Sequence, residues 1–447
     1  MSGNQALPLS AMIATAVGVV VVQSTMITML NGTGLGAMNF LLAIGISGLL
    51  ALTYVCSFAE LALMLPKSGS VSAYTQAALG PGLAIVATLS GYVAVALLGI
   101  PAELILVDTL LADVAPGLVS ILPYPSLVLL ALFCLLNLRG IDVFAHIQSA
   151  LVAIMFLGLF VIGFAGLGSG AGTALPPLAL DGAAALSLVA LAFWGLVGLE
   201  FVCPMINDAR DPQRNLPRAM IIGLVLVVAL YATFSLAGMR MLSPEKLGGA
   251  TPHVDLALAI FGPGAKLAFV VLAILGSATL LNTVLASVSR MIQGMGQSGQ
   301  LPRVFASENA RGAPTWALII FALAIAAVRV PLGLDASAIL SLTVAAAGCW
   351  LVAYMIVHLD LIVLRLRLPQ QARPFRSPIF PLPQLLGILG MGYVFLNIAP
   401  TPELAGPIYR NVAAMLGGTL LYSLVWTVLV QRRNPFQADL AGVLRQG

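Results

Sequence analysis

Glu200 stands in a long apolar segment, residues 183–206, shortly after two glycines, Gly195 and Gly198. A charged side chain is costly inside a lipid bilayer, and such residues usually mark sites that handle ions or polar solutes. Because glycine weakens a helix, we predict that the segment breaks beside the carboxylate. A break at bilayer depth persists only where its freed backbone groups face protein or a water-filled cavity. The pattern therefore predicts a polar site near the middle of the membrane.

The role of Glu200 has two interpretations. Its carboxylate could accept a proton, hold an amine or do both. Alternatively it could join neighbouring helices, which also requires a buried and paired side chain. Trp194 lies just before the glycines and could anchor the span at the membrane interface, or it could form a gate or stacking surface for a bound solute.

Three polar residues, Gln23, Ser24 and Thr25, lie together within the apolar run 9–31. Small hydroxyl side chains are common where membrane helices pack, because they bond their own backbone or a neighbouring helix. Three adjacent polar residues point in different directions around a helix, which packing alone does not require. We therefore predict that they line a substrate or ion site.

Glu103 follows Pro101 within the apolar run 82–111. We predict that it binds substrate or a proton; a structural hydrogen bond is the alternative. Asp108 lies roughly 140° further around a helix, so the two carboxylates do not form one paired site. Asp108 and Asp113 approach the outer end of the run, where we expect them to contact water.

A third polar set lies in the run 264–293. Hydroxyl and amide side chains of this kind can bind Na⁺, but bonding to their own backbone is their commoner use. The set consists of Ser277, Thr279, Asn282, Thr283, Ser287 and Ser289.

The sequence contains no pattern typical of an enzyme or a metal site. The three histidines, His146, His253 and His358, have no partner at metal-ligand spacing. There is no Ser-His-Asp set, phosphate-binding glycine loop or HExxH motif. The four cysteines lie in apolar stretches, where we interpret them as small core residues; they are Cys56, Cys134, Cys203 and Cys349.

Composition places most of the chain in a membrane. Of its 447 residues 60% are hydrophobic and only 8% charged, against about 25% charged in soluble domains, and the mean hydropathy is +1.06. A membrane-spanning helix needs about 20 apolar residues. Twelve such runs are predicted: 9–31, 38–65, 82–111, 122–138, 144–168, 183–206, 217–240, 264–293, 314–331, 335–361, 379–399 and 408–431.

Loop charge predicts the orientation. With both termini in the cytoplasm, fifteen of the 20 Lys and Arg residues fall on the inner side, the bias expected of a correct topology. The other five are Arg240, Lys246, Lys266, Arg329 and Arg410. The net charge of +4 follows from this asymmetry and does not indicate a nucleic-acid partner. The partners expected are a lipid bilayer and a small-molecule substrate, and a homodimer is left open.

Three segments, in order and at matching spacings, resemble the amino acid–polyamine–organocation (APC) transporters. Residues 57–80, SFAELALMLPKSGSVSAYTQAALG, are similar to the family's second helix and its loop. Residues 192–219, AFWGLVGLEFVCPMINDARDPQRNLPRA, are similar to its sixth helix and loop. Residues 275–305, LGSATLLNTVLASVSRMIQGMGQSGQLPRVF, are similar to its eighth. The resemblance covers nearly the whole chain.

The resemblance implies an all-α integral membrane protein with twelve transmembrane helices and the LeuT-like fold. The whole chain, 1–447, would form one transmembrane domain. It would contain two inverted repeats, 1–168 (helices 1–5) and 183–361 (helices 6–10), followed by helices 11 and 12 in 379–431. No cofactor is expected, and a proton or sodium gradient would drive transport.

The resemblance also implies a binding site between broken helices 1 and 6, walled by helices 3, 8 and 10. Trp194 matches the family's gating aromatic residue, and Glu200 matches a motif glutamate linked to amine binding or proton sensing in some members. Glu103 falls about where the family lines its side-chain pocket. With these residues, the expected site comprises Gln23, Ser24, Thr25, Ile100, Gly195, Gly198 and Ala278.

Two departures from the family pattern bear on substrate and mechanism. The family's Gly-Ser-Gly in helix 1, whose amides hold the substrate carboxylate, is replaced by Val-Gln-Ser-Thr-Met at residues 22–26. The lysine that some proton-coupled members carry in helix 5 is missing around Met155. We therefore expect a carrier for an amino acid or an organic amine, working by proton-linked symport or exchange. A polyamine or small-amine permease without carboxylate recognition, and a membrane amino-acid sensor, are the alternatives.

Overall fold

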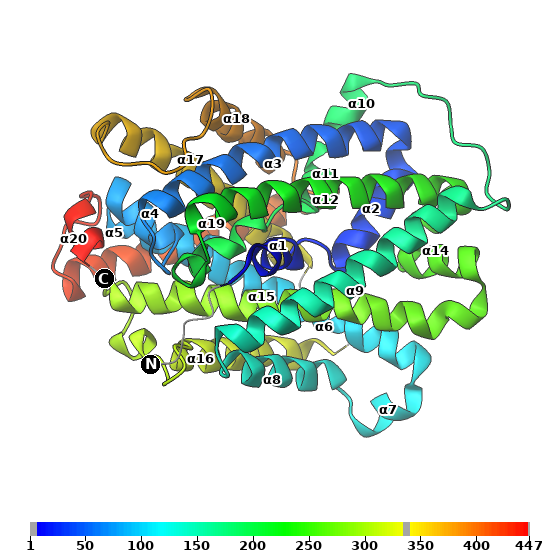
Figure 1. The fold of residues 1–447 in the computed structure, drawn as a ribbon, viewed down its shortest axis with the longest axis horizontal. Helices are drawn as coiled ribbons and strands as arrows, with labels where there is room; N and C mark the ends of the chain where they lie inside the picture. Colours follow the sequence, from blue (N-terminus) through cyan, green and yellow to red (C-terminus); the bar gives the residue numbers. More distant parts are fainter. Residues whose placement is uncertain (1–6, 334–339, 446–447) are drawn as a thin grey trace.

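The computed structural model describes residues 7–333 and 340–445, and almost all regular structure there is helical (Figure 1). An apolar chain in lipid must satisfy its backbone polar groups internally, which a helix does within one segment. One isolated backbone bridge joins Leu7 to Ala209. The all-α prediction is therefore confirmed. The first five residues of the predicted span 335–361 lie outside the described residues.

Nine helical stretches in the described residues are long and apolar enough to cross a membrane. They are α3 (Met38–Met64), α5 to α6 (Pro81–Val114), α9 (Ile141–Gly168), α11 with the 3₁₀ helix η2 (Val189–Asp208), α12 (Pro212–Met241), η3 with α15 (Pro263–Gln297), α16 with η5 (Thr315–Leu332), α17 (Leu340–Arg367) and α19 with η7 (Pro402–Val430). Helices α1 (Leu9–Gly18) and α2 (Gln23–Gly36) meet at 63° and together can form a tenth span.

The other two predicted spans correspond to shorter apolar helices. Residues 122–138 contain α8 (Pro125–Asn137), and residues 379–399 contain α18 (Leu382–Leu396). A third short apolar helix, α14 (Pro252–Phe261), lies in the loop that follows α12. The remaining short elements are α4 (Val71–Ala78), α7 (Pro116–Ile121), α10 (Gly182–Ser187), α13 (Pro244–Leu247), η4 (Arg303–Ala306) and α20 (Leu440–Arg445).

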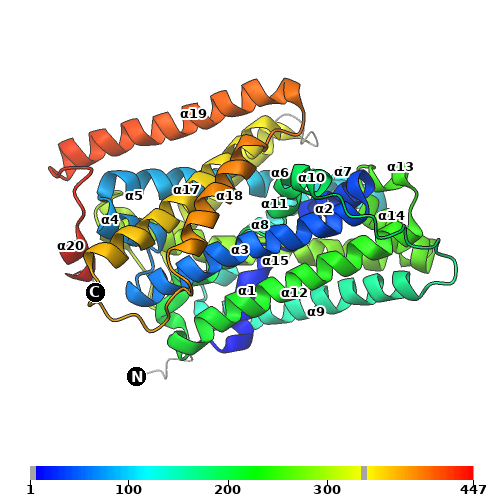
Figure 2. The ribbon, with the colours of Figure 1, turned by 90° about the horizontal axis from the view of Figure 1, so that it is seen from above.

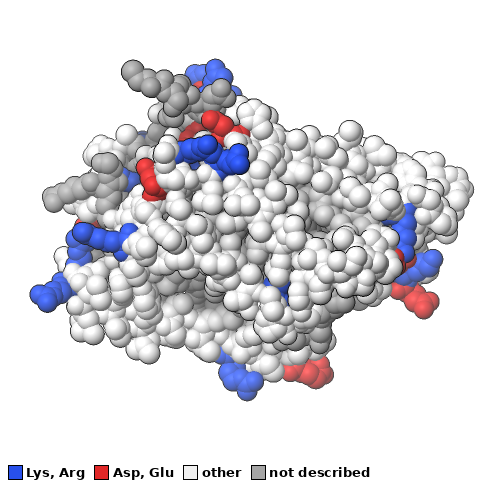
Figure 3. Space-filling model, turned by 90° about the horizontal axis from the view of Figure 1, so that it is seen from below, with Lys and Arg blue, Asp and Glu red and all other residues white. Residues whose placement is uncertain are grey.

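The long helices run side by side along the long axis of the molecule, and both chain ends lie at the same end of that axis (Figures 1 and 2). The short helix α1 lies inside the bundle, packed against α9, α12, α15 and η2. On the face drawn in Figure 3 the surface is mostly uncharged, and apart from a few side chains on its lower edge the charged residues gather toward the two ends. This distribution fits a bundle surrounded by lipid along its middle.

Candidate functional site

The predicted break beside Glu200 is present. Helix α11 ends at Trp194, residues 195–198 are not helical, and η2 begins at Leu199. Gly198 has a φ of +113°, which glycine adopts without the penalty that a Cβ brings. A Cβ added there would lie 2.8 Å from Val19 Cγ1. Glycine therefore allows the break in this span to touch the break between α1 and α2.

Tyrosines from neighbouring helices satisfy the freed backbone of residues 195–198. The hydroxyl of Tyr54 in α3 donates to the carbonyl oxygen of Leu196 at 2.6 Å, and the amide of Gly198 donates to the hydroxyl of Tyr354 in α17 at 3.1 Å. The two tyrosine rings stack with their centroids 4.5 Å apart. The break is therefore a built feature held from two sides.

The break between α1 and α2 contains four valines, residues 19–22, and no glycine. Its carbonyl groups are also bonded by side chains: Val20 O accepts from the Tyr231 hydroxyl at 2.7 Å and from Thr25 Oγ1 at 2.9 Å. Thr279 Oγ1 donates to Gly18 O at 3.0 Å. Of the predicted polar trio, Thr25 thus holds the break itself.

Glu103 lies at the amino-terminal end of α2. Its Oε1 accepts from the amide of Gln23 at 2.9 Å and from Ser277 Oγ at 2.8 Å, and its Oε2 accepts from the amide of Ser24 at 3.3 Å. Gln23 Nε2 also donates to Ser277 Oγ at 2.8 Å. Free amides and the helix dipole make this position favourable for an anion. The structure therefore joins Glu103 to two of the three predicted polar residues.

Glu200 forms a separate polar centre. Its Oε1 accepts from Trp350 Nε1 at 3.2 Å and its Oε2 from the Tyr354 hydroxyl at 2.8 Å. The carboxylate is fully buried, and Phe201 and Tyr92 pack around Trp350. These contacts join η2 to α17, as the alternative interpretation of Glu200 requires. Among the described hydrogen bonds, Glu200 and Glu103 share no partner.

The other predicted site residues carry apolar or small side chains. Ile100 and Ala278 are buried, on α6 and α15 respectively. Trp194 is half-buried and contacts Trp350 edge to face, with centroids 6.5 Å apart. Gly195 lets Met29 of α2 approach, because an added Cβ would lie 2.7 Å from its Cε.

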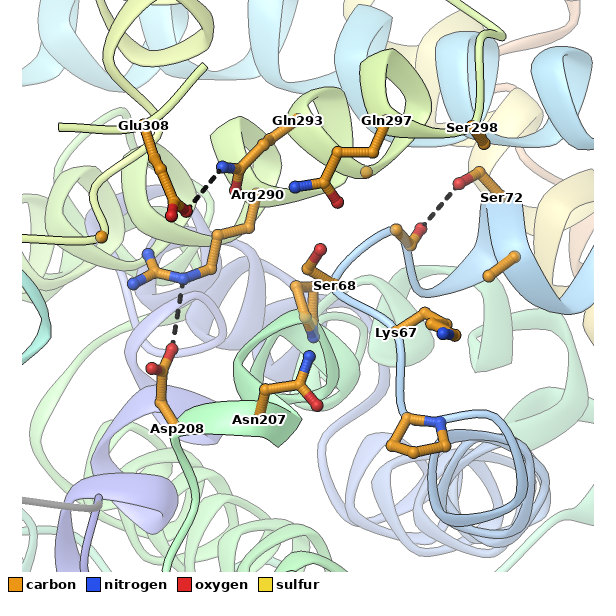
Figure 4. A pocket seen from close by; sticks show the side chains of 16 residues that line it. Lys67, Ser68, Ser72, Asn207, Asp208, Arg290, Gln293, Gln297, Ser298 and Glu308 are labelled. Atoms are coloured by element: carbon orange, nitrogen blue, oxygen red, sulfur yellow. Dashed lines mark hydrogen bonds and ion pairs between the residues drawn. The ribbon is translucent and has the colours of Figure 1, made fainter. Parts of the chain in front are cut away.

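A cavity of about 340 Å³ lies between the α3–α4 loop, the end of η2 and the carboxyl end of α15. Polar side chains from the α3–α4 loop, η2 and α15 line it, and Figure 4 shows Arg290 and Asp208 facing each other across it. Arg290 Nε lies 3.5 Å from Asp208 Oδ2. The cavity does not include Glu103 or Glu200. Both carboxylates are buried in the described conformation, whereas the cavity lies beside the Arg290–Asp208 pair.

A family model described as amino acid permease matches residues 7–429. The chain belongs to the amino acid permease family. It is 27% identical over 461 residues to the branched-chain amino acid permease BcaP of Lactococcus lactis, covering 94% of each chain. It is 24% identical to the Bacillus subtilis BcaP, over 95% of this chain and 94% of that one. A methylthioribose transporter of Bacillus subtilis is 27% identical over 85% of this chain and 86% of its own length. These relatives are carriers and not enzymes.

Among the described residues, two buried carboxylates, Asp108 and Glu60, form ion pairs that the sequence did not reveal. Asp108, expected in contact with water, is fully buried and pairs with Arg329, which the loop-charge count placed outside. Ser126 donates to it from both its amide and its hydroxyl. The prediction was wrong because a cation 221 residues away replaces water. Asp113 is half exposed and pairs with Lys266 at 2.7 Å.

The second buried pair lies between α3 and α17. Glu60 is fully buried and accepts from Arg365 and from the amide of Ser377, and Arg373 Nε lies 3.2 Å away. Glu60 stands in the AEL motif that carried part of the family resemblance, so its position in that motif was the available signal. Its partners lie more than 300 residues away, and no local pattern links them to it.

The wall of the cavity depends on close backbone packing at Gly294 of α15. A Cβ at Gly294 would lie 2.4 Å from Gly69 N and Cα in the α3–α4 loop. We expect Gly294→Ala to lower the melting temperature and destabilise the permease by about 2 kcal/mol, since backbone cannot yield as a side chain can. Gly99→Ala is the matched control, because its Cβ would meet nothing within 4 Å. Equal melting temperatures for both variants would contradict this packing.

Proposed function

We propose that this permease is a secondary active transporter that moves an amino acid or organic amine across the cytoplasmic membrane by alternating access. The observation that carries the proposal is the contact between two broken spans, Gly198 against Val19, in a chain of the amino acid permease family. Broken helices near the midplane offer free amides and carbonyls to a solute. A helix pair broken by only four residues in each span can also open on one side at a time.

The proposal includes the finer topology. Twelve spans would consist of the ten stretches above together with α8 and α18, and α1–α9 and α10–α17 would form the two inverted repeats. Both termini would lie in the cytoplasm, which agrees with their common position at one end of the bundle. The cavity between η2 and α15 would then be the inner vestibule, where substrate leaves.

Glu200 would hold the amino group of the substrate. In the described conformation Trp350 and Tyr354 occupy its carboxylate, so an amine would reach it only after α17 moves away from η2. A carboxylate–ammonium hydrogen bond is worth about 1.5–3 kcal/mol. Uptake of L-leucine or L-ornithine into reconstituted proteoliposomes, driven by an inward proton gradient or by exchange for internal substrate, would establish the activity.

Two variants separate amine binding from simple helix joining. We expect Glu200→Gln to reduce uptake about tenfold or more, because it removes the charge. Trp350→Phe removes one hydrogen bond to the same carboxylate but keeps the charge of Glu200, and we expect a smaller loss. Equal losses in both variants would show that Glu200 only joins η2 to α17. No uptake of any amino acid or amine by wild-type protein would contradict the proposed function.

A further inference from the structure

The anion position at the start of α2 is already occupied by a side chain of the permease itself. Glu103 places both carboxylate oxygens on the first two amides of this 14-residue helix, and the side chain is 3% exposed. Its described hydrogen-bond partners are Gln23, Ser24 and Ser277, none of which carries a positive charge. The two amides, the Ser277 hydroxyl and the helix dipole balance this carboxylate.

A second observation indicates that the cluster formed by Glu103, Gln23, Ser24 and Ser277 can take a further hydrogen-bond partner. Gln23 is fully buried and its Oε1 has no hydrogen-bond partner in the part of the chain that the structure describes, although its Nε2 bonds to Ser277. A buried carbonyl without a donor is unfavourable, and most such groups in folded proteins are paired. The cluster as described lacks one hydrogen-bond donor. A protonated carboxyl group supplies one donor that an ionised carboxylate does not.

We propose that Glu103 is an internal substitute for a substrate carboxylate and that exchange between the two couples one proton to each carboxylate transported. This rests on the proposed function. When a substrate carboxylate takes the amides of Gln23 and Ser24, Glu103 is displaced into a site beside it. Two adjacent carboxylates at a buried site cannot both stay ionised. Glu103 therefore takes one proton from the outer solution, and its O–H donates to Gln23 Oε1.

Release completes the cycle. When the substrate leaves toward the cytoplasm, Glu103 loses its proton to that side and returns to the two amides. One proton then enters with each zwitterionic amino acid, and one net positive charge moves. An amine without a carboxylate leaves Glu103 on the amides and carries no proton through it. The missing Gly-Ser-Gly pattern is compatible with this cycle, since the amides of residues 23 and 24 already bind a carboxylate, that of Glu103, without those glycines.

The charged groups on the helices around α6 have other partners. Helices α2 and α8 contain none. Tyr231 of α12 bonds to Val20 O. Arg329 of α16 pairs with Asp108, and Lys266 and Arg290 of α15 pair with Asp113 and Asp208 respectively. On α17, His358 bonds to Ser57, Asp360 to Thr75, Arg365 to Glu60, and Arg367 to the carbonyl oxygen of Ala78. Glu103 is thus the carboxylate placed to exchange with a substrate.

Matched ligand pairs test the exchange. L-leucine is compared with 3-methylbutylamine, and L-ornithine with putrescine, by thermal shift between pH 6 and pH 8 and by an internal pH dye in proteoliposomes. For wild-type protein we expect the affinity for the amino acid of the bound pair to fall about tenfold per pH unit, the slope for uptake of one proton. Its uptake should acidify the vesicle interior, and the matching amine should do neither.

Glu103→Gln should bind the same amino acid independently of pH and transport it without acidification. Asp113→Asn, which removes a half-exposed carboxylate of the same helix outside this cluster, should retain proton coupling. Proton uptake that persists in Glu103→Gln, or wild-type transport without acidification, would overturn the exchange and leave the transporter proposal intact. If wild-type protein binds none of the four ligands, the result would contradict both the exchange and the transporter proposal. If Glu103→Gln does not fold, the charge moved per amino acid by wild-type protein decides. The exchange predicts one positive charge per L-leucine or two per L-ornithine, and zero or one, respectively, would contradict it.

Discussion

Gly198→Val is expected to abolish transport. A φ of +113° is strained for any residue with a Cβ, at about 1–3 kcal/mol, and more so for a β-branched one. The new side chain would also meet Val19 Cγ1 at less than a normal contact distance. The two breaks would be pushed apart, and the site between them would be lost. Uptake into proteoliposomes, normalised to the amount of folded protein, measures the effect.

Two further variants isolate the contact from the backbone strain. Gly299→Val also has a positive φ, +76°, but meets nothing within 4 Å, so it reports strain alone. The double variant Gly198→Ala, Val19→Ala lacks Val19 Cγ1, the atom that a Cβ at residue 198 would meet. We expect it to take up more substrate than Gly198→Ala alone. Wild-type uptake by Gly198→Val would show that the contact between the breaks is not needed.

Arg329→Met is expected to cost about 3–5 kcal/mol of stability, because it leaves Asp108 charged and buried without a cation. The double variant Asp108→Asn, Arg329→Met should lose less than the sum of the single variants, since the two residues interact directly. Chemical denaturation in detergent micelles, followed by a spectroscopic signal of helix content, measures these differences.

The surface pair on the same helix is the control. Asp113 and Lys266 are 52% and 37% exposed, and Lys266→Met should cost under about 1 kcal/mol. Equal losses from Arg329→Met and Lys266→Met would mean that burial of the Asp108 pair has no energetic consequence.

Local signals carried the sequence predictions that were confirmed. Runs of about 20 apolar residues located the long helices because lipid demands them. Two glycines beside Glu200 located the break after Trp194, since glycine acts on its own backbone. The three motif segments, 57–80, 192–219 and 275–305, identified the family.

The remaining features depend on residues that meet only in three dimensions. The break at the four valines between α1 and α2 was expected from the family resemblance and not from local composition. It persists because Tyr231 and Thr25 bond the carbonyl group of Val20 and Thr279 bonds that of Gly18. Glu103 and Gln23 are 80 residues apart in the sequence, and only the fold shows that they are hydrogen-bonded to each other. Asp108 was misplaced for the same reason.

A structure of the permease with its transported amino acid bound would show whether the two breaks form the binding site. We expect substrate between residues 19–22 and 195–198, its carboxylate on the amides of Gln23 and Ser24, and Glu103 moved away from them. Substrate bound elsewhere, with both breaks closed and Glu103 still on those amides, would contradict it.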